Sequence, residues 1–147
     1  MPNTLKAFLL QKGYTKIKLR LTKTNHFEMT VNINNNKGTF ILDTGASNSC
    51  VDFSAKKLFD MKTKKSDIKM SGAGGTNMET KTSKNNDIKI GKWEKNKIKF
   101  VLIDLSHVNT ALTKQNAEPV NGIIGADVLK KGKGIIDYKK KHLYLRI

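Results

Sequence analysis

The stretch Phe40-Ile41-Leu42-Asp43-Thr44-Gly45-Ala46-Ser47 places a carboxylate directly after an apolar run, at a point where the chain is expected to turn. Asp-x-Gly is common in turns, because aspartate bonds to nearby backbone and glycine accepts unusual backbone angles. A carboxylate at the end of a buried strand is also well placed for function, since loops held by a rigid sheet carry many binding and catalytic groups. Asp43 is therefore the first candidate for a catalytic residue.

Strand-like patterns lie on both sides of this stretch. Apolar and polar residues alternate over Ile17–Leu21 and Phe27–Ile33, with the period of two that is typical of half-buried strands. The polar cluster Asn34–Gly38 predicts a turn, and Thr39–Leu42 predicts the returning strand of a hairpin. Further strands are predicted in Ile88–Leu105 around the turn Gly91-Lys92, in Ile123–Ile124, and in Ile135–Arg146 around the turn Lys139–Lys141. Many short strands with regular turn signals predict an all-β fold, closed as a barrel or packed as a sandwich.

One or two short helices are expected beside these strands. Asn3 or Thr4 can cap a helix that ends before Gly13. Two other short helices are predicted over Ala55–Phe59, after the cap Ser54, and over Ala126–Lys130. The stretch Ser106–Pro119 is polar and is predicted to be a loop.

The net charge of +16 is the most pronounced bulk property of the chain. A large positive potential attracts nucleic acid, anionic membranes or acidic proteins. However, lysines outnumber arginines 26 to 2 and are spread along the chain. Arginine is the residue favoured for bidentate contacts to phosphates and bases. A solvated lysine surface therefore accounts for the charge, and we expect no nucleic-acid partner.

Metal and membrane chemistry find little support in the sequence. Cys50 is the only cysteine, so no disulfide forms within the chain, and the three histidines lack the spacing of zinc ligands. No apolar run is long enough to span a bilayer, and the N-terminal residues lack the pattern of a secretory signal. We expect a cytoplasmic protein with no metal, no cofactor and no membrane partner.

Three elements together resemble the aspartic proteases. The first is the segment around Asp43, in which two apolar residues precede Asp-Thr-Gly and an alanine follows. The second, Ile123-Ile124-Gly125-Ala126-Asp127, matches two apolar residues, glycine, a variable residue and Asp or Asn. The third is a glycine-rich hairpin tip between them, Ser71-Gly72-Ala73-Gly74-Gly75-Thr76. The resemblance covers residues 16–147, as one domain, and leaves residues 1–15 as an N-terminal helical extension.

The resemblance implies hydrolysis of peptide bonds by a water molecule held between two carboxyl groups that share one proton. Asp43 would be the catalytic carboxylate. Thr44 would brace the pair through hydrogen bonds, and Gly45 would let the chain approach its mate closely.

Substrate contacts and structural roles are implied in the same way. Ala46 and Ser47 would contact the substrate from below, and a flap would close over it. The flap residues expected to bind are Ser71, Gly72, Ala73, Gly74 and Gly75. Gly125 would pack behind the catalytic loop, and Asp127 would be structural, either capping the following helix or bonding within the core.

The number of catalytic motifs predicts the assembly. The chain holds one Asp-Thr-Gly, whereas pepsin-like enzymes carry two such lobes in a chain more than twice as long. Retropepsin-like enzymes instead pair two identical chains. The resemblance therefore implies a symmetric homodimer, in which Asp43 meets its own copy. The expected function is that of an aspartic endopeptidase acting on peptides or proteins.

The chain departs from the family pattern at two places. Ala46 stands where pepsin-like members carry a serine hydroxyl, which implies activity nearer neutral pH. Ser47 and Ala126 stand where retroviral members tend to carry an ion pair, so dimer bracing should differ there. Two alternatives stay open: a non-catalytic peptide-binding or dimerisation module of the same fold, and a basic nucleic-acid-binding β-barrel. Stacking aromatic residues on one strand face would favour the barrel.

Overall fold

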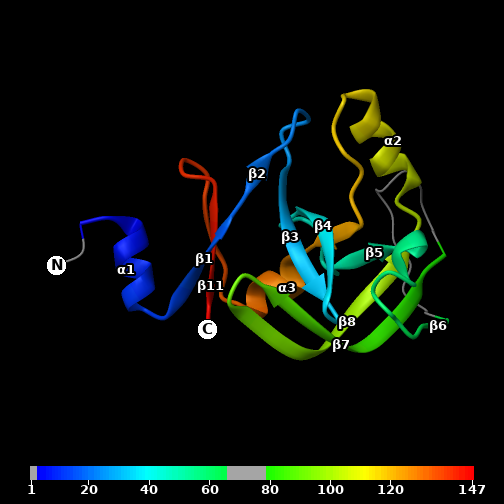
Figure 1. The fold of residues 1–147 in the computed structure, drawn as a ribbon, viewed down its shortest axis with the longest axis horizontal. Helices are drawn as coiled ribbons and strands as arrows, with labels where there is room; N and C mark the ends of the chain where they lie inside the picture. The colour runs from blue at the N-terminus through cyan, green and yellow to red at the C-terminus, as the bar shows by residue number, and fades with distance from the viewer. Residues whose placement is uncertain (1–2, 66–78) are drawn as a thin grey trace.

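Six strands close into a barrel that forms the body of the molecule (Figure 1). The computed structural model describes residues 3–65 and 79–147. One eight-stranded sheet has the order β2-β3-β4-β9-β5-β8-β7-β6, and a further pairing of β3 with β7 closes six of its strands. The strands of this sheet are β2 (Arg20–Leu21), β3 (Phe27–Ile33), β4 (Asn36–Leu42), β5 (Cys50–Asp52), β6 (Lys64–Lys65), β7 (Lys81–Ile90), β8 (Trp93–Ile103) and β9 (Gly122–Ile124). The prediction of a mostly β, closed fold is confirmed.

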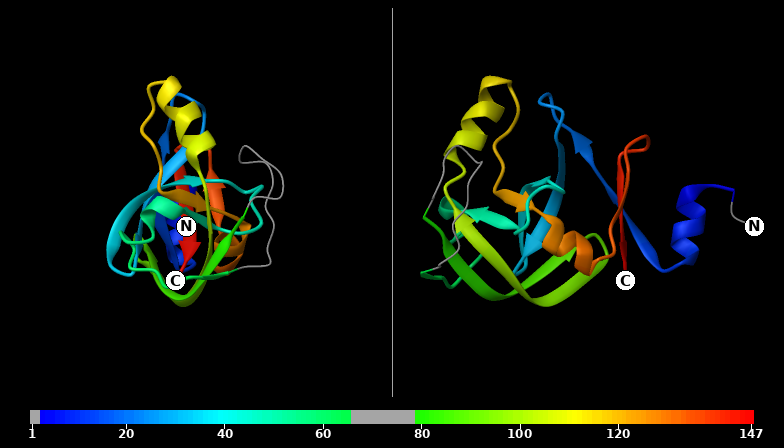
Figure 2. Two further views of the ribbon diagram at one scale, coloured as in Figure 1. Left: turned by 90° about the vertical axis from the view of Figure 1, so that its right-hand side faces the viewer. Right: turned by 180° about the vertical axis from the view of Figure 1, so that it is seen from behind.

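A second sheet joins the two ends of the chain. It has the order β1-β11-β10, with β1 (Tyr14–Lys18), β10 (Ile135–Asp137) and β11 (His142–Arg146). β1 runs antiparallel to β11 from Tyr14 opposite Arg146 to Lys18 opposite His142. The sheet lies beside the barrel, and the N-terminal helix α1 (Leu5–Gln11) lies beyond it at one end of the long axis (Figures 1 and 2).

Each predicted strand pair is present, with one tighter turn. The predicted turn over Asn34–Gly38 is shorter in the structure, because β4 already begins at Asn36. Asn34 and Asn35 carry the turn with φ of 52° and 68°. Asparagine tolerates this left-handed backbone better than most residues, which suits a two-residue hairpin turn.

The helices agree less well with the sequence. α1 follows its prediction, since the Thr4 hydroxyl accepts a hydrogen bond from the Ala7 N–H at 3.0 Å. The helix expected over Ala55–Phe59 is instead a single 3₁₀ turn, η1 (Phe53–Ala55). The loop predicted over Ser106–Pro119 was wrong, because a helix, α2 (Ser106–Lys114), occupies most of it. The helix predicted over Ala126–Lys130 is present as α3 (Ala126–Lys131).

The core has two parts. The larger part fills the barrel and reaches under the terminal sheet, where Ile17, Leu143 and Leu145 pack. The smaller part lies between the barrel wall and α2, and holds Leu112 from that helix. Burial of Leu112 explains why a polar stretch folds as a helix. No helix in the described part of the chain is long and apolar enough to cross a membrane.

Candidate active site

The two sequence motifs lie side by side in the structure. β4 runs parallel to β9, with Leu42 opposite Ile124. The chain then turns through residues 43–49 and returns as β5, which pairs with β9 on its other side. The Asp43 N–H donates to the carbonyl oxygen of Ile124 at 2.9 Å, so the turn begins on the last residue of β9.

The carboxylate of Asp43 is exposed at the end of a buried strand. Ile41 and Leu42 before it are buried, whereas Asp43, Thr44 and Gly45 are exposed. One carboxylate oxygen accepts a hydrogen bond from the Gly45 N–H at 2.9 Å. No other described residue forms a hydrogen bond or an ion pair with this carboxylate. The side chain is thus oriented by its own turn and keeps lone pairs free for water.

The conformation of this loop depends on a close approach of Gly125. The Ala126 N–H donates to the carbonyl oxygen of Ala46 at 2.7 Å. A Cβ atom on Gly125 would overlap that same oxygen, so any other residue at this position would displace the loop. This contact fits the expected packing of Gly125 behind the loop that carries Asp43.

Asp127 is held inside the protein by Ser49. Both of its carboxylate oxygens lie 3.0 Å from the Ser49 N–H, and one accepts from the Ser49 hydroxyl at 2.7 Å. The same carboxylate accepts from the Val128 N–H at 2.9 Å. Gly125 occupies the N-cap position of α3, so Asp127 is not the residue that caps the helix from outside. These contacts support a structural role for Asp127 through bonding within the core.

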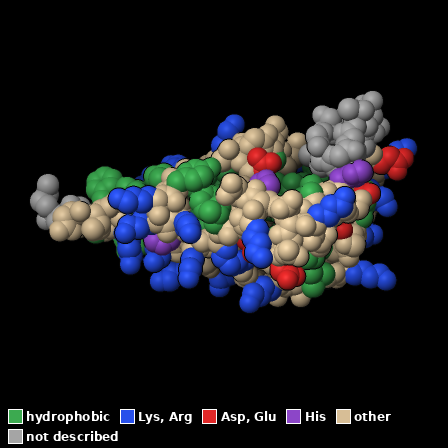
Figure 3. Space-filling view, turned by 90° about the horizontal axis from the view of Figure 1, so that it is seen from above, with side chains coloured by type: hydrophobic (Ala, Val, Ile, Leu, Met, Phe, Trp, Pro, Cys, Tyr) green, Lys and Arg blue, Asp and Glu red, His purple; other side chains and the backbone are tan. Residues whose placement is uncertain are grey.

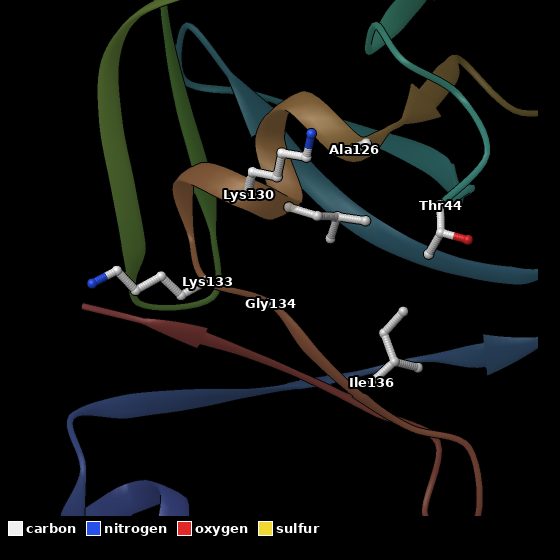
Figure 4. Close-up of a pocket in the computed structure, with 7 residues that line it drawn as sticks. Thr44, Ala126, Lys130, Lys133, Gly134 and Ile136 are labelled. Atoms are coloured by element: carbon white, nitrogen blue, oxygen red, sulfur yellow. The ribbon is translucent and has the colours of Figure 1, made fainter.

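A pocket of about 370 Å³ opens beside the candidate catalytic turn. Thr44 and Ala126 line one side of it, and Ile136 on β10 faces them across the gap (Figure 4). Lys130 and Lys133 also line it. The Thr44 side chain is exposed and its hydroxyl has no hydrogen-bond partner among the described residues. An open apolar space therefore lies directly next to the turn that carries Asp43.

Cys50 lies beneath this loop as an inert thiol. Its side chain is 1% exposed. Burial, reinforced by the nearby carboxylates of Asp127, Asp43 and Asp52, raises the pKa of Cys50 to about 12. A thiol that stays protonated at neutral pH is a poor nucleophile.

Most of the predicted site residues lie together in the structure, and the others are not among the residues that it describes. Asp43–Ser47 and Gly125–Asp127 form one site at the joined ends of β4 and β9. Ser47 is exposed and Ala46 half-buried. The flap residues Ser71, Gly72, Ala73, Gly74 and Gly75 lie outside the described residues.

Two residues that shape the site, Ser49 and Gly122, were not predicted from the sequence. Ser49 accepts a hydrogen bond from the Gly125 N–H at 2.8 Å while it donates to Asp127. At Gly122, a Cβ atom would overlap the Cys50 carbonyl oxygen and the Phe40 ring. No local pattern could reveal either contact, because the partners are far apart in the sequence.

Solved structures of two proteases and of one protease-like domain resemble this fold. A retropepsin-like aspartic protease from Rickettsia conorii is 23% identical, with a TM-score of 0.54 over 90% of this chain and 89% of its own. EIAV protease in complex with the inhibitor HBY-793 is 22% identical, with a TM-score of 0.53 over 71% of this chain and 85% of its own. The retroviral protease-like domain of Ddi1 from Leishmania major is 17% identical, with a TM-score of 0.55 over 86% of this chain and 90% of its own. The fold is therefore retropepsin-like.

Sequence comparison defines the family independently of the fold. No curated protein sequence matches the chain. Residues 29–128 match the profile of the family described as aspartyl protease. This match spans more than half of the chain and includes both motifs of the site. The chain therefore belongs to the aspartyl protease family.

Proposed function

We propose that the protein is an aspartic endopeptidase, in which Asp43 from each of two identical chains forms the catalytic pair. The observation that carries the proposal is the exposed Asp43 carboxylate, oriented by the Gly45 N–H at the end of a buried strand. Such a group can bind a water molecule and remove its proton. Peptide hydrolysis without metal or covalent intermediate also needs an acid for the leaving amine, which a second carboxyl group supplies.

Among the described residues, no other carboxyl group near the Asp43 turn is free for this role within the same chain. The carboxylates near Cys50 are those of Asp43, Asp52 and Asp127. Asp127 is engaged by Ser49 and Val128, and Asp52 accepts hydrogen bonds from the Leu105 N–H and the Ser54 hydroxyl. Both are therefore committed to holding the fold together, and Asp43 needs a partner from outside.

A two-fold axis beside Asp43 supplies that partner. In a symmetric dimer the same surface patch faces its own copy, so the exposed turn of one chain meets the exposed turn of the other. Two close carboxylates resist simultaneous ionisation, and the pair then holds one proton that serves as the acid. Thr44, whose hydroxyl is free within the described chain, would donate across the axis. The open pocket beside Thr44 would be covered by the second chain.

The substrate is proposed to be an extended peptide that lies above the two turns. Ala46 and Ser47 follow Asp43 directly and would contact the peptide from below. Ser71–Gly75 would close over it as a flap, which excludes water and offers backbone donors.

The test is cleavage of a mixed peptide library by the wild type and by Asp43→Asn, with a pepstatin-type inhibitor in parallel. The wild type should cleave, and the variant should lose about 10³-fold or more in kcat while it keeps its fold and its dimer. Asp60→Asn removes another exposed carboxylate and should cleave like the wild type. Equal cleavage by wild type and Asp43→Asn, or none by either, would remove the proposal.

A further inference from the structure

The two ends of the chain form one surface, although they are far apart in the sequence. We call residues 3–23 and 130–147 the terminal module. It contains α1, β1, β2, β10, β11 and the last two residues of α3, Lys130 and Lys131. Pairing of β1 with β11 joins its two segments. Figures 1 and 2 show α1 and this sheet at one end of the long axis, with α2 at the other end.

Most of the net positive charge of the protein lies on the terminal module. Its two segments contain thirteen lysines and arginines and one acidic residue, Asp137, a net +12 of the +16 that the whole chain carries. All thirteen side chains are exposed on the single chain, although Lys130 and Lys133 line the pocket that the second chain of the proposed dimer would cover. Within the described part of the chain, Arg20 is the one basic residue of the module in an ion pair, with Glu28 at 3.1 Å. The charge of the module is therefore largely uncompensated.

Exposed apolar side chains gather on the same module. Seven large apolar side chains are exposed among the described residues, and six belong to the module. The six are Leu5, Phe8, Leu10, Leu21, Tyr138 and Ile147. Figure 3 shows hydrophobic and basic side chains interleaved over this end, while the acidic side chains in view lie toward the other end. Scattered single apolar residues are ordinary, but this concentration is not.

The helix α1 is the part of the module with the least support from the rest of the chain. It is 7 residues long, and Leu9 is its one buried residue. Leu5, Phe8 and Leu10 are each nearly half exposed. Lys12 lies over the Phe8 ring, 5.6 Å from its centroid. A helix this short gains little stability by itself, so an apolar surface that covers these side chains would stabilise it.

A local positive potential is also visible at His142. Burial is the largest cause that lowers the pKa of His142, and Lys16 is the next. Asp137 raises this pKa, whereas Lys6 and Lys140 lower it further. These lysines come from β1, α1 and the β10–β11 turn, so three separate elements direct charge toward one spot.

We propose that the terminal module docks on an anionic phospholipid surface. Lysines near a membrane are attracted to anionic head groups, and apolar side chains beside them enter the boundary between head groups and acyl chains. Both kinds of side chain are present here on one end of one molecule. This proposal departs from the expectation of no membrane partner, which rested on the absence of an apolar run long enough to span a bilayer and did not consider docking on a membrane surface.

The composition of the module favours a lipid surface over a nucleic acid. Arginine supplies 2 of the 13 basic residues of the module, and bidentate contacts to phosphates and bases depend on arginine. Phe8 and Tyr138 are the two exposed aromatic side chains of the module. Tyr138 already packs against Phe27, with ring centroids 4.9 Å apart, so it is not free to stack on a base. A nucleic acid would leave the leucines of α1 uncovered.

The test is co-sedimentation with vesicles of phosphatidylglycerol and phosphatidylcholine, compared with vesicles of phosphatidylcholine alone, at low and high salt. The wild type should bind the anionic vesicles at low salt and be released at high salt. It should not bind the neutral vesicles. The readout does not depend on peptide hydrolysis, so this test and the test of the proposed function can fail separately.

Two sets of variants locate the contact. Replacing Lys139, Lys140 and Lys141 together by glutamine should lower the partition constant at least about tenfold, and Leu5→Gln with Phe8→Gln should lower it as well. Matched controls replace exposed residues outside the module and should bind like the wild type. They are the combined variant Lys56→Gln, Lys57→Gln and Lys62→Gln, and the single variant Leu58→Gln.

Several results would overturn the proposal. The proposal is contradicted if the wild type does not bind anionic vesicles. It is also contradicted if the module variants and the control variants lose vesicle binding to the same extent. Capture of single-stranded RNA with no vesicle binding would favour a nucleic acid instead. If Leu5→Gln with Phe8→Gln weakens only the dimer, measured by sedimentation, the apolar face belongs to the interface between two copies of the chain.

Discussion

Ser49 and Asp127 are joined by three hydrogen bonds although they lie 78 positions apart in the sequence. The Ser49 N–H reaches both carboxylate oxygens of Asp127 at 3.0 Å, and the hydroxyl donates to one of them at 2.7 Å. Ser49 ends the turn that carries Asp43, and Asp127 lies in the first turn of α3. This link therefore fixes the candidate catalytic turn to the helix behind it.

Ser49→Ala should destabilise the protein by about 1–3 kcal/mol. The substitution leaves the buried Gly125 N–H without its acceptor and removes one donor from the Asp127 carboxylate. Urea denaturation measures the change. Ser47→Ala, which alters an exposed serine in the same turn, is the control and should unfold like the wild type. Equal midpoints for the two variants would show that the link contributes nothing to stability.

Gly125→Ala should be poorly tolerated, whereas Gly134→Ala should be neutral. A Cβ atom on Gly125 overlaps the Ala46 backbone, but on Gly134 its nearest neighbours are a side-chain carbon and the backbone oxygen of Leu129, both at 3.4 Å, which is ordinary van der Waals contact. Forcing the extra methyl group into the first site should cost about 1–3 kcal/mol and displace the turn. Thermal unfolding and peptide hydrolysis measure the two effects. A Gly125→Ala protein with wild-type stability and activity would contradict the described packing.

The strands could be predicted because alternation of apolar and polar residues records burial on one face directly. Phe27–Ile33 shows this clearly, since every second side chain is buried. The helix α2 could not be predicted in this way. Its N-cap residue is Leu105, which makes no side-chain capping bond, although the Asp104 carboxylate before it accepts from the Ser106 N–H at 2.8 Å. Leu112 is its one buried residue, so the usual pattern of an N-cap followed by an apolar face is weak. Its burial depends on barrel strands that are distant in the sequence.

The site was predictable where its residues are consecutive. Asp43 and Gly125 belong to short motifs whose chemistry is legible from neighbouring residues. Ser49 was missed because its role depends on a contact across 78 positions. The charge of the terminal module was missed for a related reason, since pairing of β1 with β11 gathers lysines that are separate in the sequence.

The pKa of His142 should lie below its ordinary value of 6.5. Burial and then Lys16 and Lys6 disfavour the charged imidazole, and together they outweigh Asp137, which favours it. The folded protein therefore holds the neutral imidazole, and the unfolded chain binds a proton first as the pH falls. The contribution of His142 to stability should be present above about pH 6.5 and be lost as the pH falls through the lower, folded value.

Nuclear magnetic resonance of the imidazole measures this titration. Added salt, or Lys16→Gln, should raise the midpoint toward the ordinary value, because either one weakens the lysine part of the shift. Lys56→Gln, in another part of the molecule, should leave the midpoint unchanged. A midpoint at or above 6.5 in the wild type would contradict the described environment of His142.

The pairing of Asp43 with its own copy is tested most directly by mixing subunits. Wild-type protein is allowed to exchange chains with increasing amounts of Asp43→Asn, and peptide hydrolysis is measured per wild-type chain. If each active site needs one Asp43 from each chain, mixed dimers are inactive, and an equal mixture should keep about half of the activity per wild-type chain. Activity per wild-type chain that stays constant at every ratio, with chain exchange verified by sedimentation of labelled protein, would contradict a shared catalytic pair.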